Sequence, residues 1–273
     1  GLGVFEGVRA YKTAQGSSIF RLMDHTERLF KSANTVNMNI PYSRDVINAA
    51  HCEVVKTNNL SESYIRPMCF YGSEEMGIRA DNLSVHLMVA AWEWPSYMDP
   101  EAKEKGIKVM ISSYKRQVGN PVASAKVNGN YVTSIVALNE AIEQGYDEAL
   151  MLDAENNIAE GTGENFFIVK DGILKTPDLD ASLDGITRKT IIEIAKEKGV
   201  EVQIKKISLE EVMLSDEAFF TGTAAEVVPI NSIDGVAIGS GKRGAVTEDL
   251  QSDYFNQVRG LRKENKAWHT YVS

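Results

Sequence analysis

Strand-like and helix-like segments alternate along this chain, and no other feature constrains its fold as much. Residues 4–11 and 18–21 are rich in β-branched and aromatic side chains, which is typical of strands. Leu29, Ala33 and Val36 follow at the i, i+4, i+7 spacing of one helix face. Because the two patterns continue to alternate, we expect an α/β (α+β) fold.

The alternation continues to the end of the chain. A second helix is expected to place Val46, Ala50 and Val54 on one apolar face. A polar helix is expected from about Thr247. The other predicted segments are strands at 62–71, 84–94, 107–113, 148–152, 165–169, 202–207 and 218–221, and helices around 135–142 and 187–198, the last ending at Gly199.

Proline and charge cluster near the end of the first third of the chain. Pro95 and Pro100 stand just before the charged run 101–105, a composition typical of a boundary. At about 150 residues per domain, 273 residues correspond to one or two domains. We therefore expect a small N-terminal domain at 1–97, a linker at 98–105 and a larger domain at 106–273. The chain opens at Gly1 inside a strand-like run, so we also expect that a further segment precedes it.

Composition excludes several classes of function. The chain has 29 basic and 38 acidic residues, a formal charge of −9, which argues against nucleic acid or an anionic membrane surface as partner. The longest clear apolar run, 87–92, is far short of the roughly 18 residues of a membrane span. Two cysteines and four histidines without ligand spacing predict no structural metal. Together with the absence of a signal peptide, these features indicate the cytoplasm.

One glycine motif offers an alternative function of a different class. Residues 239–244 match G-x-G-x-x-G and precede a predicted helix, as in nicotinamide-dependent oxidoreductases. Only 29 residues follow Gly244, and no second parallel strand is evident, although a dinucleotide site needs one. We therefore favour an ordinary turn that enters a helix.

The most informative residue is Lys126. It is the only charged residue among the 22 residues of 117–138, and its neighbours are small. The common alternative is a lysine whose stem packs on apolar surface while its ammonium reaches water. A lysine without a local carboxylate can instead lose its charge, and a neutral amine serves as a nucleophile or Schiff-base partner.

Three loops add candidate anion-binding groups. Residues 159–165 combine two glycines with Glu160 and Glu164, and the alternative for this segment is a solvated hairpin turn. At 184–188, Thr187 is either an N-cap or part of a phosphate-binding helix start. Hydroxyl and backbone donors at 221–226 suit an anion. A lone lysine, a carboxylate loop and two anion cradles together fit pyridoxal 5'-phosphate, an aldehyde-bearing phosphorylated pyridine.

Seven motifs in order carry a resemblance that covers essentially the whole chain. They lie at residues 4–11, 25–29, 64–67, 125–131, 160–165, 185–188 and 222–226. The sequence resembles the branched-chain amino acid aminotransferases, members of the class IV aminotransferases and of the fold-type IV pyridoxal-phosphate enzymes. The resemblance implies a small α/β domain, a larger pseudo-barrel β domain with flanking helices, and a cofactor in the cleft between the halves.

The resemblance also implies a role for each motif residue toward the cofactor. Lys126 would form a Schiff base with pyridoxal phosphate and then move the proton between Cα and C4′. Glu160 would face the pyridine nitrogen and Tyr131 the ring phenolate. The phosphate would be held by Arg28, Ile186, Thr187 and Thr223.

The implied reaction is reversible transamination between leucine, isoleucine or valine and 2-oxoglutarate. Tyr64 and the Thr223–Ala224 backbone would bind the α-carboxylate, and Arg66 the distal carboxylate of glutamate. The apolar side chain would contact Phe5, Gly7, Trp94, Tyr97 and Tyr131.

The resemblance leaves further alternatives open. A D-amino acid aminotransferase or an aminodeoxychorismate lyase shares the fold, and an inactive relative would bind without turnover. Met76 and Ile78 would reach a neighbouring subunit, which implies a homodimer or a larger assembly such as a hexamer. Family members carry a further N-terminal segment, and their loop around 115–121 is about one residue longer, so no role is assigned to Arg116.

Overall fold

The computed structural model describes residues 2–94 and 101–272, and the chain forms two compact units. The first unit comprises Gly1–Pro95, Ala125–Asn130 and Gln257–Ser273. The second comprises Ser96–Ser124 and Tyr131–Asn256. The chain thus returns twice to the first unit, once with the short segment that carries Lys126 and once with its C-terminus.

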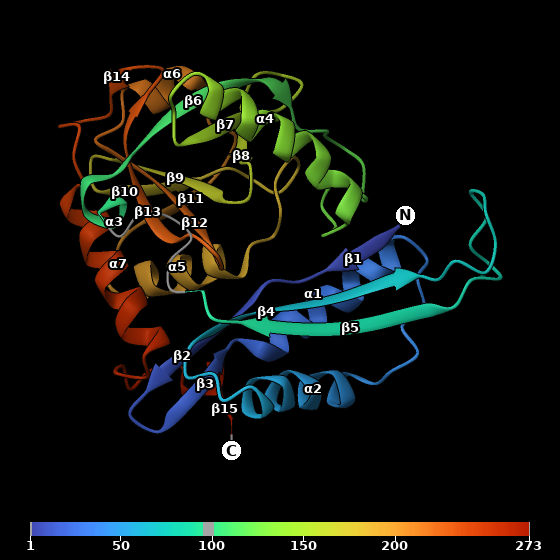
Figure 1. The fold of residues 1–273 in the computed structure, drawn as a ribbon. Coiled ribbons are helices and arrows are strands. Elements are labelled where there is room, and N and C mark those ends of the chain that lie inside the picture. The colour runs from blue at the N-terminus through green and yellow to red at the C-terminus, as the bar shows by residue number, and fades with distance from the viewer. Residues whose placement is uncertain (1, 95–100, 273) are drawn as a thin grey trace. The chain divides into compact units, whose positions relative to one another are not determined.

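An antiparallel sheet forms the centre of the first unit (Figure 1). Its strands run in the order β1-β4-β2-β3-β15, and β5 pairs with β4. The C-terminal strand lies against β3, with His269 opposite Phe20, a pairing that no sequence pattern indicated. The strands are β1 (Gly3–Phe5), β2 (Val8–Thr13), β3 (Gly16–Phe20), β4 (Ser63–Tyr71), β5 (Val85–Trp92) and β15 (His269–Tyr271).

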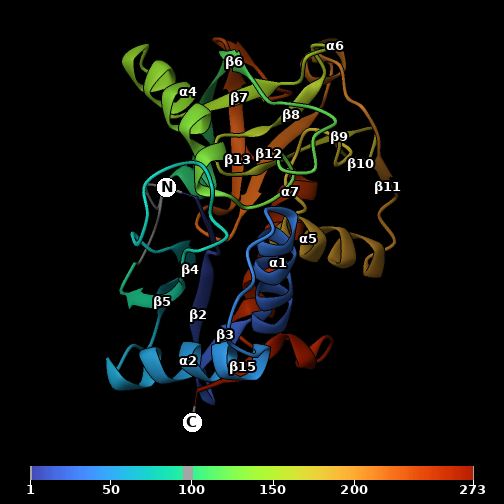
Figure 2. The ribbon, with the colours of Figure 1, turned by 90° about the vertical axis from the view of Figure 1, so that its right-hand side faces the viewer.

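Two helices, α1 (Leu22–Thr35) and α2 (Arg44–Thr57), belong to the same unit (Figure 2). The Ser43 side chain caps α2 by accepting the Val46 N–H. The predicted helix is present, but the face proposed for it is wrong: α2 buries Ile47, His51 and Val55, whereas Val46 is 52% exposed. Both rows have helical spacing and differ by one residue, which turns the buried face by about 100°.

The second unit is built on a mixed sheet that curls into a partly open barrel (Figure 2). The strand order is β11-β10-β9-β12-β13-β6-β7-β8, and β14 pairs with β13. Phe166, Phe220 and Val228 are among the fully buried residues of its core. The strands are β6 (Ile107–Lys115), β7 (Glu148–Leu152), β8 (Ile158–Gly161), β9 (Asn165–Lys170), β10 (Ile173–Thr176), β11 (Val202–Ile204), β12 (Glu217–Gly222), β13 (Glu226–Ile233) and β14 (Val236–Ala237).

Helix α4 of the second unit packs through small side chains. Ala137 and Ala141 are buried against Met110 of β6 and Met151 of β7. Its larger apolar residues are exposed, and Ile135 is 58% accessible. The helices of this unit are α3 (Ala102–Lys105), α4 (Tyr131–Glu143), α5 (Ile186–Glu197), α6 (Leu209–Met213) and α7 (Ala245–Val258). Within the described ranges, no helix is both long and apolar enough to cross a membrane.

Candidate active site

The backbone around Lys126 is fixed within the first unit by hydrogen bonds on both sides. The Phe5 N–H donates to the Lys126 carbonyl at 3.1 Å, and the Lys126 N–H donates to the Ser32 hydroxyl at 3.0 Å. Val127 forms a bridge to Val4 of β1. Strand β1 and helix α1 therefore determine where the lysine side chain starts.

The Lys126 side chain has the environment of a reactive amine. Its Nζ lies 4.7 Å from the centre of the Phe5 ring. Burial, followed by the nearby Arg28 charge, lowers the pKa of Lys126 to about 8, although Glu6 acts in the opposite direction. At a pKa near 8, about one amine in ten is neutral at pH 7, which is far more than for an exposed lysine.

Glu6 is a buried residue of this site to which the sequence analysis gave no role. Its carboxylate binds Arg28 at 2.6 and 2.9 Å, and His25 Nδ1 lies 2.7 Å from it. Burial alone would raise the pKa of Glu6, but Arg28 and His25 outweigh burial and hold that pKa well below its ordinary range. A lone acidic residue between the apolar residues of 4–8 was the available signal. The chain bends there, since the predicted strand 4–11 is interrupted at Glu6 and Gly7.

Five of the residues expected to bind substrate, Phe5, Gly7, Tyr64, Arg66 and Trp94, belong to the first unit. A Cβ on Gly7 would lie 1.9 Å from the Tyr64 hydroxyl, so only glycine allows this approach. Arg66 Nη2 donates to the same hydroxyl at 3.3 Å, and its guanidinium lies 4.8 Å from the Phe5 ring centre. Trp94 contacts Tyr64 edge-on, with ring centres 4.8 Å apart. The predicted Tyr97 lies outside the described residues.

Arg66 has a feature suited to an anionic ligand. Its Nε is buried and makes no hydrogen bond within the described residues. Such a donor is costly to leave unsatisfied, and a carboxylate is the group that a guanidinium binds best.

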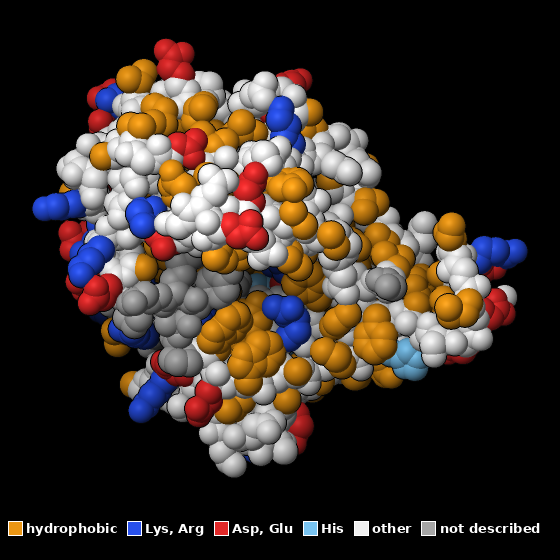
Figure 3. Space-filling model, turned by 45° about the horizontal axis from the view of Figure 1, so that its top comes forward, with side chains coloured by type: hydrophobic (Ala, Val, Ile, Leu, Met, Phe, Trp, Pro, Cys, Tyr) orange, Lys and Arg blue, Asp and Glu red, His pale blue; other side chains and the backbone are white. Residues whose placement is uncertain are grey.

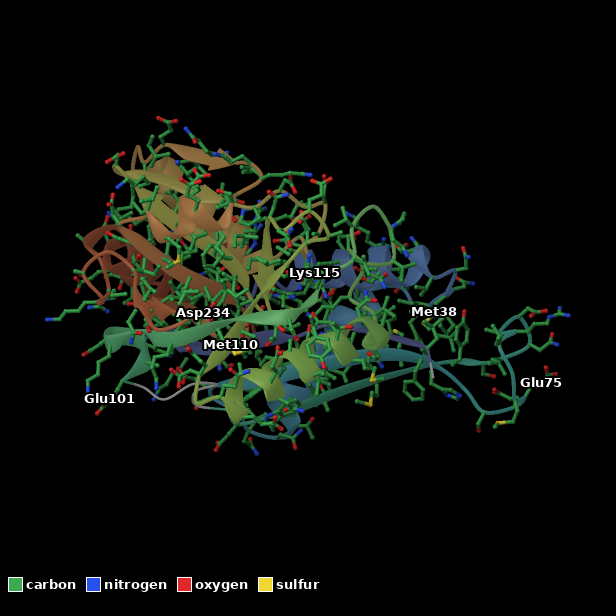
Figure 4. The ribbon with its side chains drawn as sticks, turned by 90° about the horizontal axis from the view of Figure 1, so that it is seen from above. Met38, Glu75, Glu101, Met110, Lys115 and Asp234 are labelled. Atoms are coloured by element: carbon green, nitrogen blue, oxygen red, sulfur yellow. The ribbon has the colours of Figure 1, made fainter. Side chains whose placement is uncertain are left out.

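Glu160 is buried at the end of β8 in the second unit, and its carboxylate is held by several donors. Arg116 Nη2 lies 2.6 Å from Glu160 Oε1. The Leu183 N–H donates to Oε2 at 2.9 Å, and the Asn165 amide donates to the same oxygen at 3.3 Å. Figure 4 shows β6 leading from Met110, beside Asp234, to Lys115, which precedes Arg116. Because Arg116 and Glu160 lie far apart in the sequence, spacing gave no indication of this ion pair.

Of the two alternatives for Thr187, an N-cap or part of a phosphate-binding helix start, the structure contradicts the first. The cap is Gly185, which provides no side-chain hydrogen bond. A Cβ at Gly185 would lie 1.8 Å from Asn165 Oδ1, so Gly185 and Asn165 are matched. The N–H groups of Ile186 and Thr187 are at the first turn of the helix, where helical geometry provides no acceptor. This arrangement suits an anion.

The turn between β12 and β13 carries the other predicted anion ligands. Gly222 pairs with Glu226 across the turn, and Thr223 and Ala224 are half-buried at its tip. Glu226 has a φ of 64° and forms an ion pair with Lys103. Tyr131 is the first residue of α4 and is half-buried.

The glycine motif 239–244 does not form a dinucleotide site. It lies between the two-residue antiparallel strand β14 and helix α7. The Glu217 carboxylate accepts the N–H groups of Val246 and Thr247 at 3.0 and 2.7 Å. The start of α7 is thus occupied by a side chain, which leaves no place there for a pyrophosphate. Across the described residues, no group of three or more His, Cys, Asp or Glu side chains is arranged to hold a metal ion.

Comparisons with known proteins identify relatives that share most of the chain and its fold. A branched-chain-amino-acid aminotransferase of Pseudomonas aeruginosa is 56% identical over 273 residues, which are 100% of this chain and 89% of that protein. The crystal structure of the Escherichia coli branched-chain amino acid aminotransferase superposes with a TM-score of 0.96 at 40% identity, covering 99% of this chain and 90% of that one. The T.th. enzyme complexed with N-(5'-phosphopyridoxyl)-L-glutamate gives 0.95 at 43% identity, with 99% and 89% covered.

These superpositions confirm the fold that the resemblance implied. The family profile described as "Amino-transferase class IV" matches residues 3–233, which is most of the chain. The chain belongs to the class IV aminotransferase family.

Proposed function

We propose that this protein is a branched-chain amino acid aminotransferase that interconverts leucine, isoleucine or valine and 2-oxoglutarate with branched 2-oxo acids and L-glutamate. The observation that carries the proposal is the fixed, partly buried Lys126, whose pKa is lowered to about 8. The relatives with 40–56% identity described above bear the same name.

The residues present fit pyridoxal 5'-phosphate. Glu160 is a buried carboxylate already paired with Arg116, and the uncapped start of α5 suits a phosphate. When bound, the cofactor supplies an aldehyde for the amino group and a ring that accepts negative charge from Cα. We propose that Lys126 binds the aldehyde carbon, that Glu160 holds the proton on the pyridine nitrogen, and that Tyr131 donates to the ring oxygen. The proposed phosphate ligands are Arg28, Ile186, Thr187 and Thr223.

In this proposal Lys126 also moves the proton during the reaction. Once the substrate amino group has replaced Lys126 on the aldehyde carbon, the released neutral amine would take the proton from substrate Cα and return it at C4′ of the cofactor, or the reverse. The lowered pKa serves this step because proton transfer is most efficient when the pKa lies near the working pH. Glu6 fixes Arg28 through two hydrogen bonds, which holds in place one of the charges that lower the pKa of the amine.

Substrate recognition is assigned to the strands of the first unit and to the β12–β13 turn. Tyr64 and the backbone of Thr223 and Ala224 bind the α-carboxylate, and Arg66, with its unsatisfied Nε, binds the distal carboxylate of glutamate. The solved complex of the T.th. enzyme contains a phosphopyridoxyl derivative of glutamate, which supports glutamate as the shared amino donor. The aliphatic side chain contacts Phe5, Gly7, Trp94, Tyr97 and Tyr131.

We also propose that the protein acts as a homodimer or a larger assembly such as a hexamer. Met76 and Ile78 are fully exposed in the loop between β4 and β5, where Figure 4 labels Glu75. Many further hydrophobic side chains are exposed on the face in Figure 3. Such exposure is typical of an interface. Light scattering tests the assembly, and a monomeric mass at working concentration would contradict it.

A cytoplasmic location is proposed on the basis of the two cysteines. Both are free thiols, and Cys69 is buried in β4. Free thiols are typical of a reducing compartment.

A substrate screen tests the reaction. The purified protein loaded with pyridoxal phosphate is supplied with 2-oxoglutarate and either L-leucine or D-alanine, and glutamate formation is measured. We expect turnover with the L-amino acid. Turnover with D-alanine alone would identify a D-amino acid aminotransferase, and pyruvate release from aminodeoxychorismate without amino transfer would identify the lyase.

A second experiment tests the lysine. Borohydride reduction of the loaded enzyme followed by peptide mass mapping should find the cofactor on Lys126. A label on a different lysine would refute the assignment.

A further inference from the structure

Glu148 and Glu164 are two buried carboxyl groups of the second unit to which the proposed reaction gives no role. Glu148 is the first residue of β7, and Glu164 lies in the turn between β8 and β9; they are 1% and 3% exposed. Leu150 of β7 lies opposite Gly161 of β8, which places Glu148 beside the turn that carries Glu164, and the two carboxyl groups are close enough to share a hydrogen bond. Because a carboxylate oxygen can only accept, this bond requires a proton on one of them.

The donors around the two groups identify Glu164 as the one that carries the proton. Glu148 accepts the Ala149 N–H at 2.7 Å and is also bonded by the N–H and hydroxyl of Thr162. Burial raises the pKa of Glu148 as well, but these donors oppose that effect and favour Glu148 as the charged partner. Glu164 accepts the Gly163 N–H at 2.9 Å. Burial, followed by the charge of Glu148 and to a smaller extent that of Glu160, raises the pKa of Glu164 well above its ordinary value.

The Glu164 side chain also packs between two glycines that belong to the candidate site. A Cβ on Gly161 would lie 3.0 Å from Glu164 Oε2, and a Cβ on Gly222 would lie 3.6 Å from Glu164 Cγ. The Gly161 N–H donates to the Glu164 carbonyl at 2.7 Å, which closes the turn. Glu160 directly precedes this turn, so a displacement of Glu164 would move Glu160 relative to Arg116.

We propose that Glu148 and Glu164 share one proton and that the pair positions the Glu160 carboxylate. The Glu164 O–H donates to the Glu148 carboxylate, which attaches the turn to β7. Because Glu164 is neutral in this arrangement, the turn is fixed without a third negative charge beside Glu160 and Glu148, where Arg116 is the neighbouring cation. The inference rests on the proposed role of Glu160 toward the pyridine nitrogen.

Infrared spectroscopy of the protein without added cofactor tests the shared proton. We expect the carbonyl stretch of a protonated carboxylic acid near neutral pH in the wild-type protein and its loss in Glu164→Gln. The matched control is Glu143→Gln, which changes an exposed residue of α4 and should keep the band. A band that is absent from the wild-type protein, or that survives Glu164→Gln, would overturn the shared proton.

A double-mutant cycle tests the positioning role, with the dissociation constant of pyridoxal phosphate as the readout. Glu164→Leu removes the donor and should weaken binding about tenfold, whereas Glu164→Gln keeps a neutral donor and should stay within about twofold. In the Glu160→Gln background the effect of Glu164→Leu should disappear, because the carboxylate that it positions is gone. An equal loss in both backgrounds would show that the pair does not act through Glu160.

A further variant, Thr162→Val, and the binding of pyridoxal phosphate to the wild-type protein distinguish failure of the carboxyl pair from failure of the proposed function. Thr162→Val removes a hydroxyl donor to Glu148 and replaces Glu164→Leu in the cycle if the leucine variant does not fold. It should weaken binding less, and only when Glu160 is present. Failure of the wild-type protein to bind pyridoxal phosphate would contradict the proposed function, whereas the infrared result tests the pair independently.

Discussion

The two units bury carboxylates in opposite ways. In the first, Glu6 has no exposed surface and is compensated by Arg28 and His25, so its pKa is held low. In the second, Glu164 faces another carboxyl group, and its pKa is raised. The difference shows that burial does not fix the charge of a carboxyl group. A nearby cation keeps the group ionised, whereas a nearby carboxylate makes protonation the less costly state.

The same contrast explains where each unit can place reactive chemistry. Glu6 stays ionised, but its charge is compensated by Arg28 and His25, which limits the negative charge that acts on Lys126. Burial and Arg28 therefore prevail, and the pKa of the Lys126 amine falls to about 8. In the second unit, proton sharing leaves Arg116 to pair with Glu160. One unit thus provides a proton-accepting amine, and the other a fixed carboxylate.

The largest effect is expected for Lys126→Ala. Loss of the amine should lower kcat with L-leucine by about a thousandfold or more, because it removes both the proposed attachment point of the cofactor and the proposed proton carrier. Circular dichroism should show an intact fold. The control is Lys12→Ala, at an exposed lysine of β2, and it should leave kcat unchanged. Turnover of Lys126→Ala at a rate near that of the control would contradict this role.

The next largest effect is expected in stability, where Glu6→Gln should cost more than Glu160→Gln. Glu6→Gln leaves Arg28 without its buried counter-charge and should cost about 3–5 kcal/mol in free energy of unfolding. Glu160→Gln should cost less, because the Leu183 N–H and the Asn165 amide can still donate to the remaining carbonyl oxygen. Urea unfolding of both variants measures the difference. A greater loss from Glu160→Gln would reverse the comparison between the units.

The dependence of stability on pH should have opposite signs in the two units. The pKa values of Glu6 and His51 are lowered in the folded protein. Each group therefore contributes stability at pH values above its ordinary pKa, and this stability is lost as pH falls below that value. For His51, the shift from 6.5 to about 4 corresponds to about 3 kcal/mol, lost between those pH values. The raised pKa of Glu164 acts in reverse, since its contribution is complete below about 4.5 and is lost as pH rises.

Urea midpoints measured across pH test these signs. His51→Gln should flatten the acid side of the profile, and Glu164→Gln should flatten the decline toward higher pH. Glu143→Gln serves as the exposed control. An unchanged acid side in His51→Gln would show that this histidine is not the group that titrates there.

What the sequence predicted and what it missed follow from the range of the interactions. Local patterns located most helices and strands; β7 has the predicted bounds, and Gly199 follows α5 with a φ of 75°. Patterns could not assign the buried face of α2, because Val46 and Ile47 start two rows with the same spacing. The return of the C-terminus as β15 involves too few residues to give a pattern.

The candidate site shows the same limit. Motif residues such as Lys126 and Glu160 were singled out as candidates because their neighbours in the sequence are distinctive. The ion-pair partners of Glu160 and Arg28 were missed. Arg116 becomes significant only when the fold brings it to Glu160, and Glu6 only when the fold brings it to Arg28. An ion pair between distant segments leaves no spacing signal in a single sequence.

The smallest expected effects come from two glycines, one in each unit, and they separate substrate from cofactor binding. A Cβ on Gly7 would meet the Tyr64 hydroxyl at 1.9 Å, and a Cβ on Gly185 would meet Asn165 Oδ1 at 1.8 Å. In both cases the atom that must move is the end of a side chain, so each alanine substitution should cost only about 1–3 kcal/mol of stability.

The functional consequences of these substitutions should differ. Gly7→Ala displaces Tyr64, the proposed carboxylate ligand, and should raise KM for L-leucine while leaving the dissociation constant of pyridoxal phosphate unchanged. Gly185→Ala displaces Asn165 from Glu160 and should weaken pyridoxal phosphate binding first. If both variants changed the same constant by the same factor, the division of substrate and cofactor contacts between Tyr64 and Glu160 would be wrong, because each glycine contacts only one of the two networks.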